Sequence, residues 1–172
     1  MRGQLYYVIL VTMKLKLSHK PWWGELEHDL KELLTQSETL FNRVSAWEQD
    51  FHDYSFLVFP AAKAYEGFLK STFLDLGLIT SQDYYGKRFR IGRALNPELD
   101  EKKVSVYEAL ASFCGDESVS RQLWATWKES RNLLFHWFPN EINAVSYQEA
   151  RNRIMMVVEA MDVVHLSCKI KK

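Results

Sequence analysis

Apolar side chains recur every three or four residues along most of this chain. Between positions 24 and 50 this spacing follows the 3.6-residue period of an α-helix and predicts an amphipathic helix with one buried stripe. The apolar positions of this stretch are Leu26, Leu30, Leu33, Leu34, Leu40, Phe41, Val44 and Trp47.

A second and more apolar segment covers positions 53–79. Asp53 and Ser55 are candidate caps for its first turn. Pro60 suits a first turn or a kink, and Gly77 suits a helix stop. Because its apolar residues occupy several faces, we expect this helix to be central and buried.

The helical period is lost over positions 80–103, which collect glycine, asparagine and proline and therefore predict a long loop. Three further helices are expected after it. The first covers 104–113, the second opens at Ser118 or Ser120 and runs to Pro139, and the third follows a capping box at position 146 and reaches about Cys168.

These patterns predict one all-α domain over 1–172, with a bundle of four to five helices at 24–168. At 172 residues, 47% of them hydrophobic, the chain is long enough to bury a core. The apolar run at 5–13 is shorter than the ~20 residues that span a bilayer, so we expect positions 1–20 to form an arm or a strand on the body, with no membrane contact.

The net charge and the two cysteines limit the kinds of binding site that we expect in this chain. The formal net charge is +0, so a site for a polyanion has to be local. Cys114 and Cys168 lack the spacing of a zinc site and are expected to be buried thiols in a cytoplasmic protein. His28 and Glu32 lie four residues apart without a third metal ligand. We therefore expect neither a metal nor a cofactor.

The segment "ESRNLLFHWFP", residues 129–139, carries the strongest candidate site. Arg131 and Asn132 precede His136 on the expected helix. Five helical steps separate Arg131 from His136 by about 140° beyond a full turn, so the two side chains converge only if the helix ends or distorts there. The alternative is a histidine that caps its own helix and an arginine in a surface ion pair, since this short pattern is expected roughly once by chance.

Two stretches of the chain resemble one protein family. "RNLLFH", near the end of the penultimate helix, resembles the R-x4-6-H signature of the HEPN superfamily of ribonucleases. "AAKAYEGFLKSTFLDLGLI", residues 61–79, is similar to the central helix of the C-terminal toxin domain of RNase LS-type toxins, and "GKRFRIGRALN" continues the likeness. The resemblance covers about 47–164 and implies a HEPN-like bundle.

The resemblance also implies roles for individual residues. An acidic residue of the central helix joins the arginine and histidine in that group, and Glu66 is the residue that matches. The alternative is a surface pair between Glu66 and Lys63 or Lys70. Phe138 stands where antitoxin-linked members carry a tyrosine, so control by modification of that residue is not expected.

The function implied is a metal-independent endoribonuclease of toxin–antitoxin or antiviral-defence type, in which the RNA 2′-hydroxyl attacks the adjacent phosphorus. His136 would move the proton, Arg131 would hold the phosphate oxygens, and the amide of Asn132 would orient the phosphate or the histidine. Acid and base steps need two such groups, so a homodimer with a shared cleft is expected, with a protein antitoxin as a further partner.

Positions 84–93 mix cations with aromatic rings, a composition that suits single-stranded RNA, although a solvated charged loop is the alternative. The expected RNA contacts are Tyr85, Lys87, Arg88, Arg90 and Arg93. A different class of function also stays open, namely a catalytically silent HEPN-like helical module that binds RNA, a nucleotide or a partner protein. Arg151 and Asn152 repeat the Arg-Asn pair without a following histidine and provide an internal control.

Overall fold

The computed structural model describes residues 14–98, 105–137, 139 and 144–168, and every regular element within these ranges is helical. The longer helices are α2 (His28–Val44), α3 (Ser55–Asp75), α6 (Val106–Cys114), α7 (Glu117–Trp127) and α8 (Tyr147–Ser167). The shorter elements are η1 (Pro21–Glu25), α4 (Ser81–Tyr85), α5 (Ile91–Ala94) and η2 (Lys128–Asn132). The prediction of an all-α fold is confirmed.

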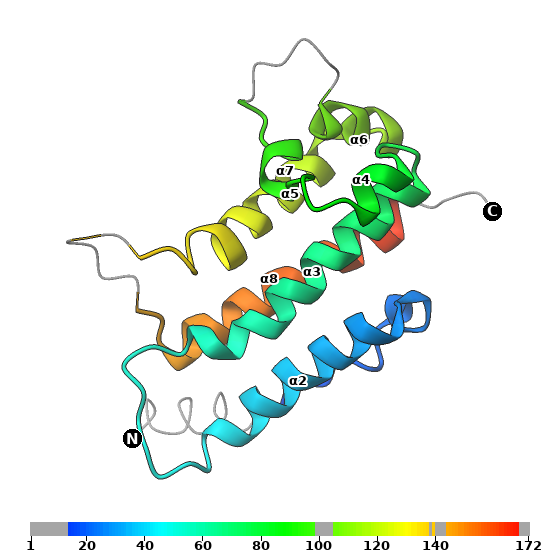
Figure 1. The fold of residues 1–172 in the computed structure, drawn as a ribbon. Helices are drawn as coiled ribbons and strands as arrows, with labels where there is room; N and C mark the ends of the chain where they lie inside the picture. Colours follow the sequence, from blue (N-terminus) through cyan, green and yellow to red (C-terminus); the bar gives the residue numbers. More distant parts are fainter. Residues whose placement is uncertain (1–13, 99–104, 138, 140–143, 169–172) are drawn as a thin grey trace.

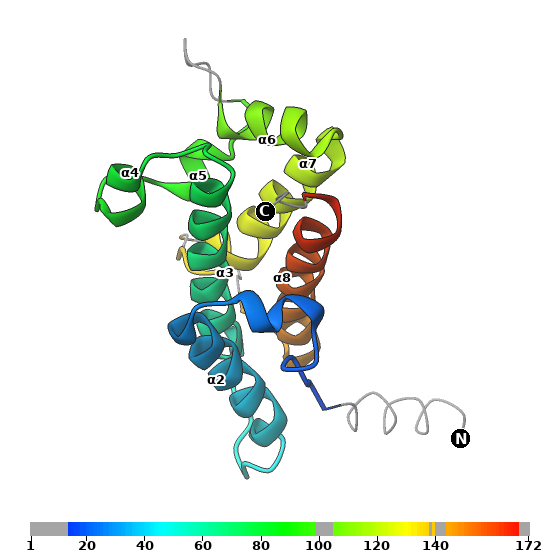
Figure 2. The same cartoon turned by 90° about the vertical axis from the view of Figure 1, so that its right-hand side faces the viewer.

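Helices α3 and α8 run side by side through the middle of the molecule (Figures 1 and 2). Helix α2 packs on α3 at one end, while α6 and α7 pack on each other at the opposite end, with α7 also against α8. Helix α3 is buried on several faces, as its apolar content predicts. Its fully buried side chains include Leu57, Val58, Ala61, Ala64, Tyr65, Leu69 and Phe73.

Helix α3 begins and ends near the expected residues. The carboxylate of Asp53 accepts hydrogen bonds from the backbone amides of Ser55, at 2.9 Å, and of Val145, at 3.1 Å, so it fixes the start of α3 to the segment that leads into α8. Gly77 follows the helix with φ +70°, a conformation that favours glycine. Pro60 lies inside α3 rather than in its first turn, because the helix starts five residues before it.

The expected end of α2 and the expected start of α7 are wrong. Helix α2 ends at Val44, so Trp47 lies beyond it, 43% exposed, and its ring stacks on Phe56. Helix α7 starts at Glu117 rather than at Ser118 or Ser120, because the carboxylate of Asp116 already accepts a hydrogen bond from the Ser118 amide. The expected loop at 80–103 contains α4 and α5 in its described part.

Cys114 and Cys168 form a disulfide, with 4.9 Å between their Cα atoms, so the prediction of separate free thiols is wrong. The bond joins the end of α6 to the residue that follows α8. Their separation of 54 residues gave no sign of this contact, which arises because the last residue of α6 lies beside the residue that follows α8.

Of the expected N-terminal arm, residues 14–20 are described, and they hold no strand; the apolar run at 5–13 lies outside the described residues. Leu15 and Leu17 are buried, and their amides donate to side chains of α2: Leu15 to Asn42 at 2.8 Å and Leu17 to Glu38 at 2.6 Å. This segment therefore packs along α2. Among the described residues, no helix has both the length and the apolar character that crossing a bilayer requires.

Candidate functional site

The helix that carries Arg131 changes its winding just before that residue. Helix α7 continues directly into the π-helical turn η2, in which the Leu133 amide donates to the carbonyl of Lys128 at 2.9 Å. The helix ends at Asn132 and not near Pro139 as expected. In the π-helical turn the hydrogen bonds join residues five positions apart, and this change interrupts the α-helical hydrogen-bond pattern. Single π-helical turns are rare and occur often at functional sites.

The π-helical turn is fixed to α8 by two consecutive residues. Glu129 forms an ion pair with the guanidinium of Arg153, and the hydroxyl of Ser130 donates to the Arg153 carbonyl at 3.2 Å. Ser130 is buried, so this bond anchors the turn from the inside. Arg131, the next residue, is thereby directed away from α8 and toward α3.

Arg131 and Glu66 meet across the contact between η2 and α3. The Nη2 atom of Arg131 lies 3.7 Å from an Oε atom of Glu66, and the guanidinium carbon lies 5.1 Å from the centre of the Trp127 ring. The two charged side chains are 39% and 33% exposed. Among the described residues, Glu66 forms no ion pair with Lys63 or Lys70, so the surface pair considered from the sequence is absent.

A buried tyrosine holds this part of α3 against α7. The hydroxyl of Tyr65, the residue before Glu66, donates to the carbonyl of Leu123 at 3.1 Å. Burial raises the pKa of Tyr65 well above its usual value, and a hydrogen bond with Thr126 offsets only part of that rise. Tyr65 therefore stays protonated and keeps donating, which fixes the position of its neighbour. No pattern in the sequence indicates this role.

The segment after the π-helical turn carries His136. Phe135 packs edge-on against Phe59 of α3, with ring centres 5.3 Å apart, so the chain is anchored immediately before the histidine. His136 itself is exposed. Because the helix ends at Asn132, the 140° separation on a straight helix does not apply. Asn132 is partly buried and its side-chain amide has no hydrogen-bond partner among the described residues, while Phe138 lies outside them.

The basic residues expected to contact RNA are all exposed, and Tyr85 is 81% exposed. They are Lys87, Arg88, Arg90 and Arg93. Arg90 donates from Nη1 to the carbonyls of Lys87, at 2.5 Å, and Phe89, at 3.2 Å, which stiffens the loop. The neighbouring Tyr84 instead turns inward, and its hydroxyl donates to the carboxylate of Glu27 at 2.8 Å.

The basic loop and Arg131 share one buried side chain, Trp127. A Cβ atom placed on Gly92 of α5 would lie 2.7 Å from the indole nitrogen of Trp127, so only a glycine allows the backbone this close. Arg131 lies over the same indole ring. The packing therefore brings the loop at 87–93 and the segment "RNLLFH" to one region, although Arg93 and Arg131 are 38 positions apart in the sequence.

One group of potential metal ligands lies elsewhere, on α2. His28, Asp29 and Glu32 have ligand atoms within 4.8 Å of one another, so Asp29 supplies a third group beside the pair that is spaced four residues apart. All three side chains are exposed, and exposed acidic groups commonly gather in this way without an ion.

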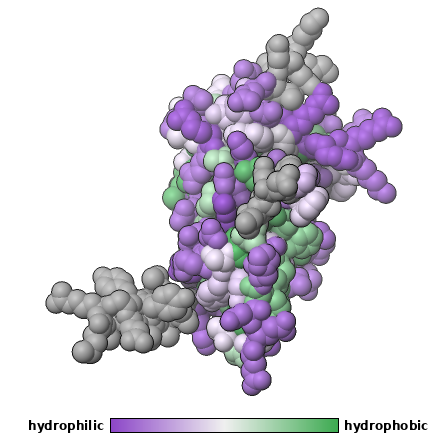
Figure 3. All heavy atoms as spheres, turned by 90° about the vertical axis from the view of Figure 1, so that its left-hand side faces the viewer, coloured by the Kyte–Doolittle hydropathy of each residue, from purple (hydrophilic) through white to green (hydrophobic). Residues whose placement is uncertain are grey.

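Hydrophilic and hydrophobic residues occupy different parts of the face that carries η2, which lies at the left of Figure 1. Figure 3 shows hydrophilic residues over much of its upper part and a band of hydrophobic residues in its lower half. Several large apolar side chains of α3 and of the segment around η2 are exposed. They are Phe59 at 53%, Leu133 at 40% and Trp137 at 82%.

Neither a protein-family model, nor a curated protein, nor a solved structure matches this chain.

Proposed function

We propose that this chain is a metal-independent endoribonuclease of the HEPN type, acting in a toxin–antitoxin or antiviral-defence system. The observation that carries the proposal is Arg131 itself. It projects from a π-helical turn, lies 3.7 Å from Glu66 and remains 39% exposed, so its guanidinium is held in place and still open to a ligand.

The arrangement suits cleavage by the RNA's own 2′-hydroxyl. The planar guanidinium of Arg131 would hold the non-bridging phosphate oxygens and stabilise their growing charge. His136, exposed on the segment that follows, would transfer the proton, and the unpartnered amide of Asn132 would orient the phosphate. Glu66 would position Arg131 through their ion pair.

The loop at 87–93 would bind the rest of the strand. The side chains of Lys87 and Arg88 have no hydrogen-bond or ion-pair partner among the described residues, so their charges are available to phosphates. Tyr85 exposes its ring to solvent, as a platform for a base requires. The shared contact with Trp127 places this loop beside Arg131.

A homodimer would complete the site, because each chain supplies one motif histidine and the reaction needs both an acid and a base. The exposed apolar side chains Phe59, Leu133 and Trp137 suit such an interface. The proposal implies a cytoplasmic location, where RNA is found, and a protein antitoxin that masks the site. Disulfides are rare in that compartment, so Cys114 and Cys168 would be reduced there.

The experiment that tests the proposal compares two arginines. Arg131→Ala is expected to lower the single-turnover rate of RNA cleavage by about 10²–10³, and His136→Ala by about 10²–10⁴. Arg151→Ala is the matched control, because Arg151 also precedes an asparagine but has no histidine at the spacing of the motif. Arg151→Ala should lower the cleavage rate only modestly, and this loss should disappear when the variant and the unaltered chain are compared at saturating RNA.

Similar effects of Arg131→Ala and Arg151→Ala would contradict the proposal. The ion pair of Arg131 with Glu66 would then be a structural contact, and a catalytically silent HEPN-like module that binds RNA, a nucleotide or a partner protein would be the better account. Thermal unfolding of each variant separates a lost catalytic group from a lost fold.

A further inference from the structure

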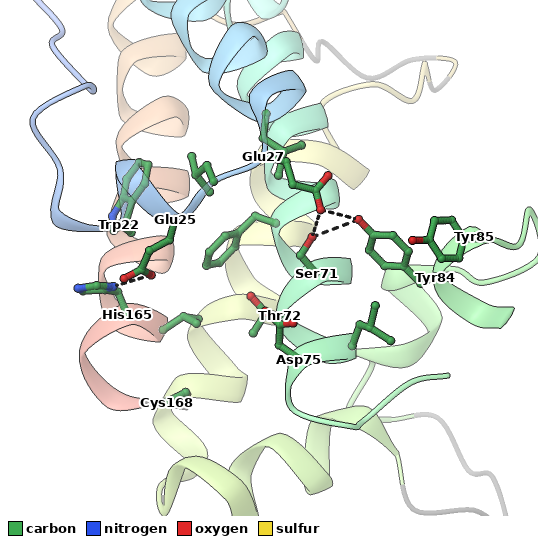
Figure 4. Close-up of a pocket in the computed structure, with 15 residues that line it drawn as sticks. Trp22, Glu25, Glu27, Ser71, Thr72, Asp75, Tyr84, Tyr85, His165 and Cys168 are labelled. Atoms are coloured by element: carbon green, nitrogen blue, oxygen red, sulfur yellow. Dashed lines mark hydrogen bonds and ion pairs between the residues drawn. The ribbon is translucent and has the colours of Figure 1, made fainter. Parts of the chain in front are cut away.

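A pocket of about 650 Å³ lies at the end of the molecule where the η1 segment, the second half of α3, α4 and the end of α8 meet. Figure 4 shows the side chains that converge on it from these elements. Its volume falls within the range of roughly 300–1,000 Å³ that is typical of sites for small molecules. None of the residues proposed above as catalytic lines it.

The walls of this pocket combine aromatic rings with carboxylates. Trp22, Phe68, Tyr84 and Tyr85 contribute rings, and Glu25, Glu27 and Asp75 contribute acidic groups. The pocket has no lysine or arginine among its lining residues, all of which belong to the described part of the chain. In a chain of formal net charge +0, the lining of this pocket therefore carries a local excess of negative charge.

Hydrogen bonds and one ion pair hold some of the pocket carboxylates in place and offset only part of their negative charge. One oxygen of Glu27 accepts hydrogen bonds from the hydroxyls of Tyr84, at 2.8 Å, and Ser71, at 3.2 Å, while its other oxygen has no partner among the described residues (Figure 4). Glu25 lies 3.3 Å from the imidazole of His165. Asp75 has neither a hydrogen-bond nor an ion-pair partner among the described residues.

We propose that this pocket binds a small organic cation, in which an ammonium group is attached to a flat aromatic body. The carboxylates of Glu27 and Asp75 would pair with the charge, and the partly exposed ring of Tyr84 would hold the aromatic body and contribute cation–π attraction. A metal ion fits less well, because the carboxylates of the pocket do not gather at ligand distance; within the described residues only the α2 group does.

The pocket is separate from the proposed catalytic site but adjoins its RNA-binding loop. Along α3, Ser71 and Asp75 are turned about 140° and 180° away from Glu66, so an occupant would not touch Arg131. Tyr84 and Tyr85 belong to α4, which leads directly into the loop at 87–93. A bound cation would therefore contact the residues that precede the loop without entering the proposed active site.

The test is an NMR titration of the full chain with tryptamine and, separately, with indole-3-acetate, which carries the same ring and the opposite charge. Tryptamine is expected to bind with a dissociation constant of about 1 mM or lower, and indole-3-acetate at least about tenfold more weakly. The double variant Glu27→Gln, Asp75→Asn should weaken tryptamine binding about tenfold. Glu159→Gln, an exposed carboxylate of α8 outside the pocket, should leave binding unchanged.

Equal binding of the two ligands would overturn the proposal, because the carboxylates would then play no part. Undiminished tryptamine binding by the double variant would overturn it as well, since the site would lie elsewhere. So would the absence of tryptamine binding at about 10 mM, which is weaker than a specific site of this size requires. The comparison of the two ligands on the unaltered chain does not depend on how the variants fold.

Discussion

Glu66 and Arg131 lie 65 positions apart in the chain and 3.7 Å apart in space. Both side chains are about one-third exposed, so their ion pair contributes at most about 1 kcal/mol to stability. If the pair serves to position the guanidinium, its removal affects catalysis far more than folding. This difference separates a positioning role from a structural one.

We expect Glu66→Gln to lower the single-turnover rate of RNA cleavage clearly, while the free energy of unfolding changes by less than about 1 kcal/mol. The matched control is Lys63→Gln, which removes a charge one turn away on α3 that forms no ion pair with Glu66. Normal cleavage by Glu66→Gln would show that the carboxylate has no part in the site.

Tyr65 gives a pH-dependent prediction. Burial raises the pKa of its hydroxyl in the folded state, whereas the unfolded chain has a value near 10.0. Above that pH the unfolded state loses a proton that the folded state keeps. The contribution of Tyr65 to the free energy of unfolding is therefore fully present below about pH 10 and is lost as the pH rises further. Tyr65→Phe should remove this part of the decline, measured by chemical denaturation between about pH 8 and 11.

A Tyr65→Phe variant whose stability declines with pH as steeply as that of the unaltered chain would contradict this account. At neutral pH the same variant should lose about 1–3 kcal/mol, because the buried carbonyl of Leu123 loses its donor.

At the residue scale, residue type, spacing and resemblance single out Glu66, Arg131 and His136 in the sequence. The structure brings Arg131 and Glu66 within 3.7 Å of each other, and the catalytic roles of the three residues stay predictions. The contact of Tyr65 with Leu123 was not predictable, because an aromatic residue on a buried helix face looks like any other core residue. The disulfide was not predictable either, since nothing local distinguishes two paired cysteines from two buried thiols.

At the element scale, α5 depends on a glycine at its contact with Trp127. Gly92→Ala places a methyl group 2.7 Å from the indole nitrogen, and the indole, only 4% exposed, has little room to move. We expect a loss of about 1–3 kcal/mol in the free energy of unfolding and weaker RNA cleavage, because Arg131 lies over the same ring. Gly24→Ala is the control, since a Cβ atom there meets nothing within 4 Å. Equal stability of the two variants would contradict the packing described.

The disulfide between α6 and the end of α8 closes a segment of 54 residues. Restricting the unfolded chain over a loop of this length is worth about 4 kcal/mol in the chain-entropy model, and engineered cases often give less. Cys168→Ser should therefore lower the melting temperature of the oxidised protein, while a reducing agent should lower that of the unaltered chain and leave the variant unaffected. An unaltered chain that is insensitive to reduction would show that this bond adds no stability.

Periodicity was sufficient to predict the long helices and insufficient at their ends. The apolar patterns of α2, α3 and α8 extend over 17 to 21 residues and are clear in the sequence. Helices α4 and α5 have five and four residues, too few to display a period, although Thr80 and Asp83 form a capping box that marks the first. The π-helical turn at η2 has no sequence pattern, so the early end of that helix was missed.

At the scale of the whole molecule, the proposed mechanism requires a dimer. Sedimentation at micromolar concentration should show two chains associated over an interface of about 1,600 Å² or more. Trp137→Ser removes the most exposed large apolar side chain among the described residues, 82% exposed, and is expected to weaken association and cleavage together. Full activity from a protein that sediments as a monomer would contradict the shared cleft.

The most direct test of the central claim is the cleavage of a single-stranded RNA in excess EDTA, with the ends of the products identified and a DNA of the same sequence as control. The account predicts that RNA is cut without a metal ion, that the fragments end in a 2′,3′-cyclic phosphate or its hydrolysis product, and that DNA, which lacks the 2′-hydroxyl, stays intact. Cleavage that requires Mg²⁺ or Mn²⁺, or that cuts DNA as readily, would contradict it.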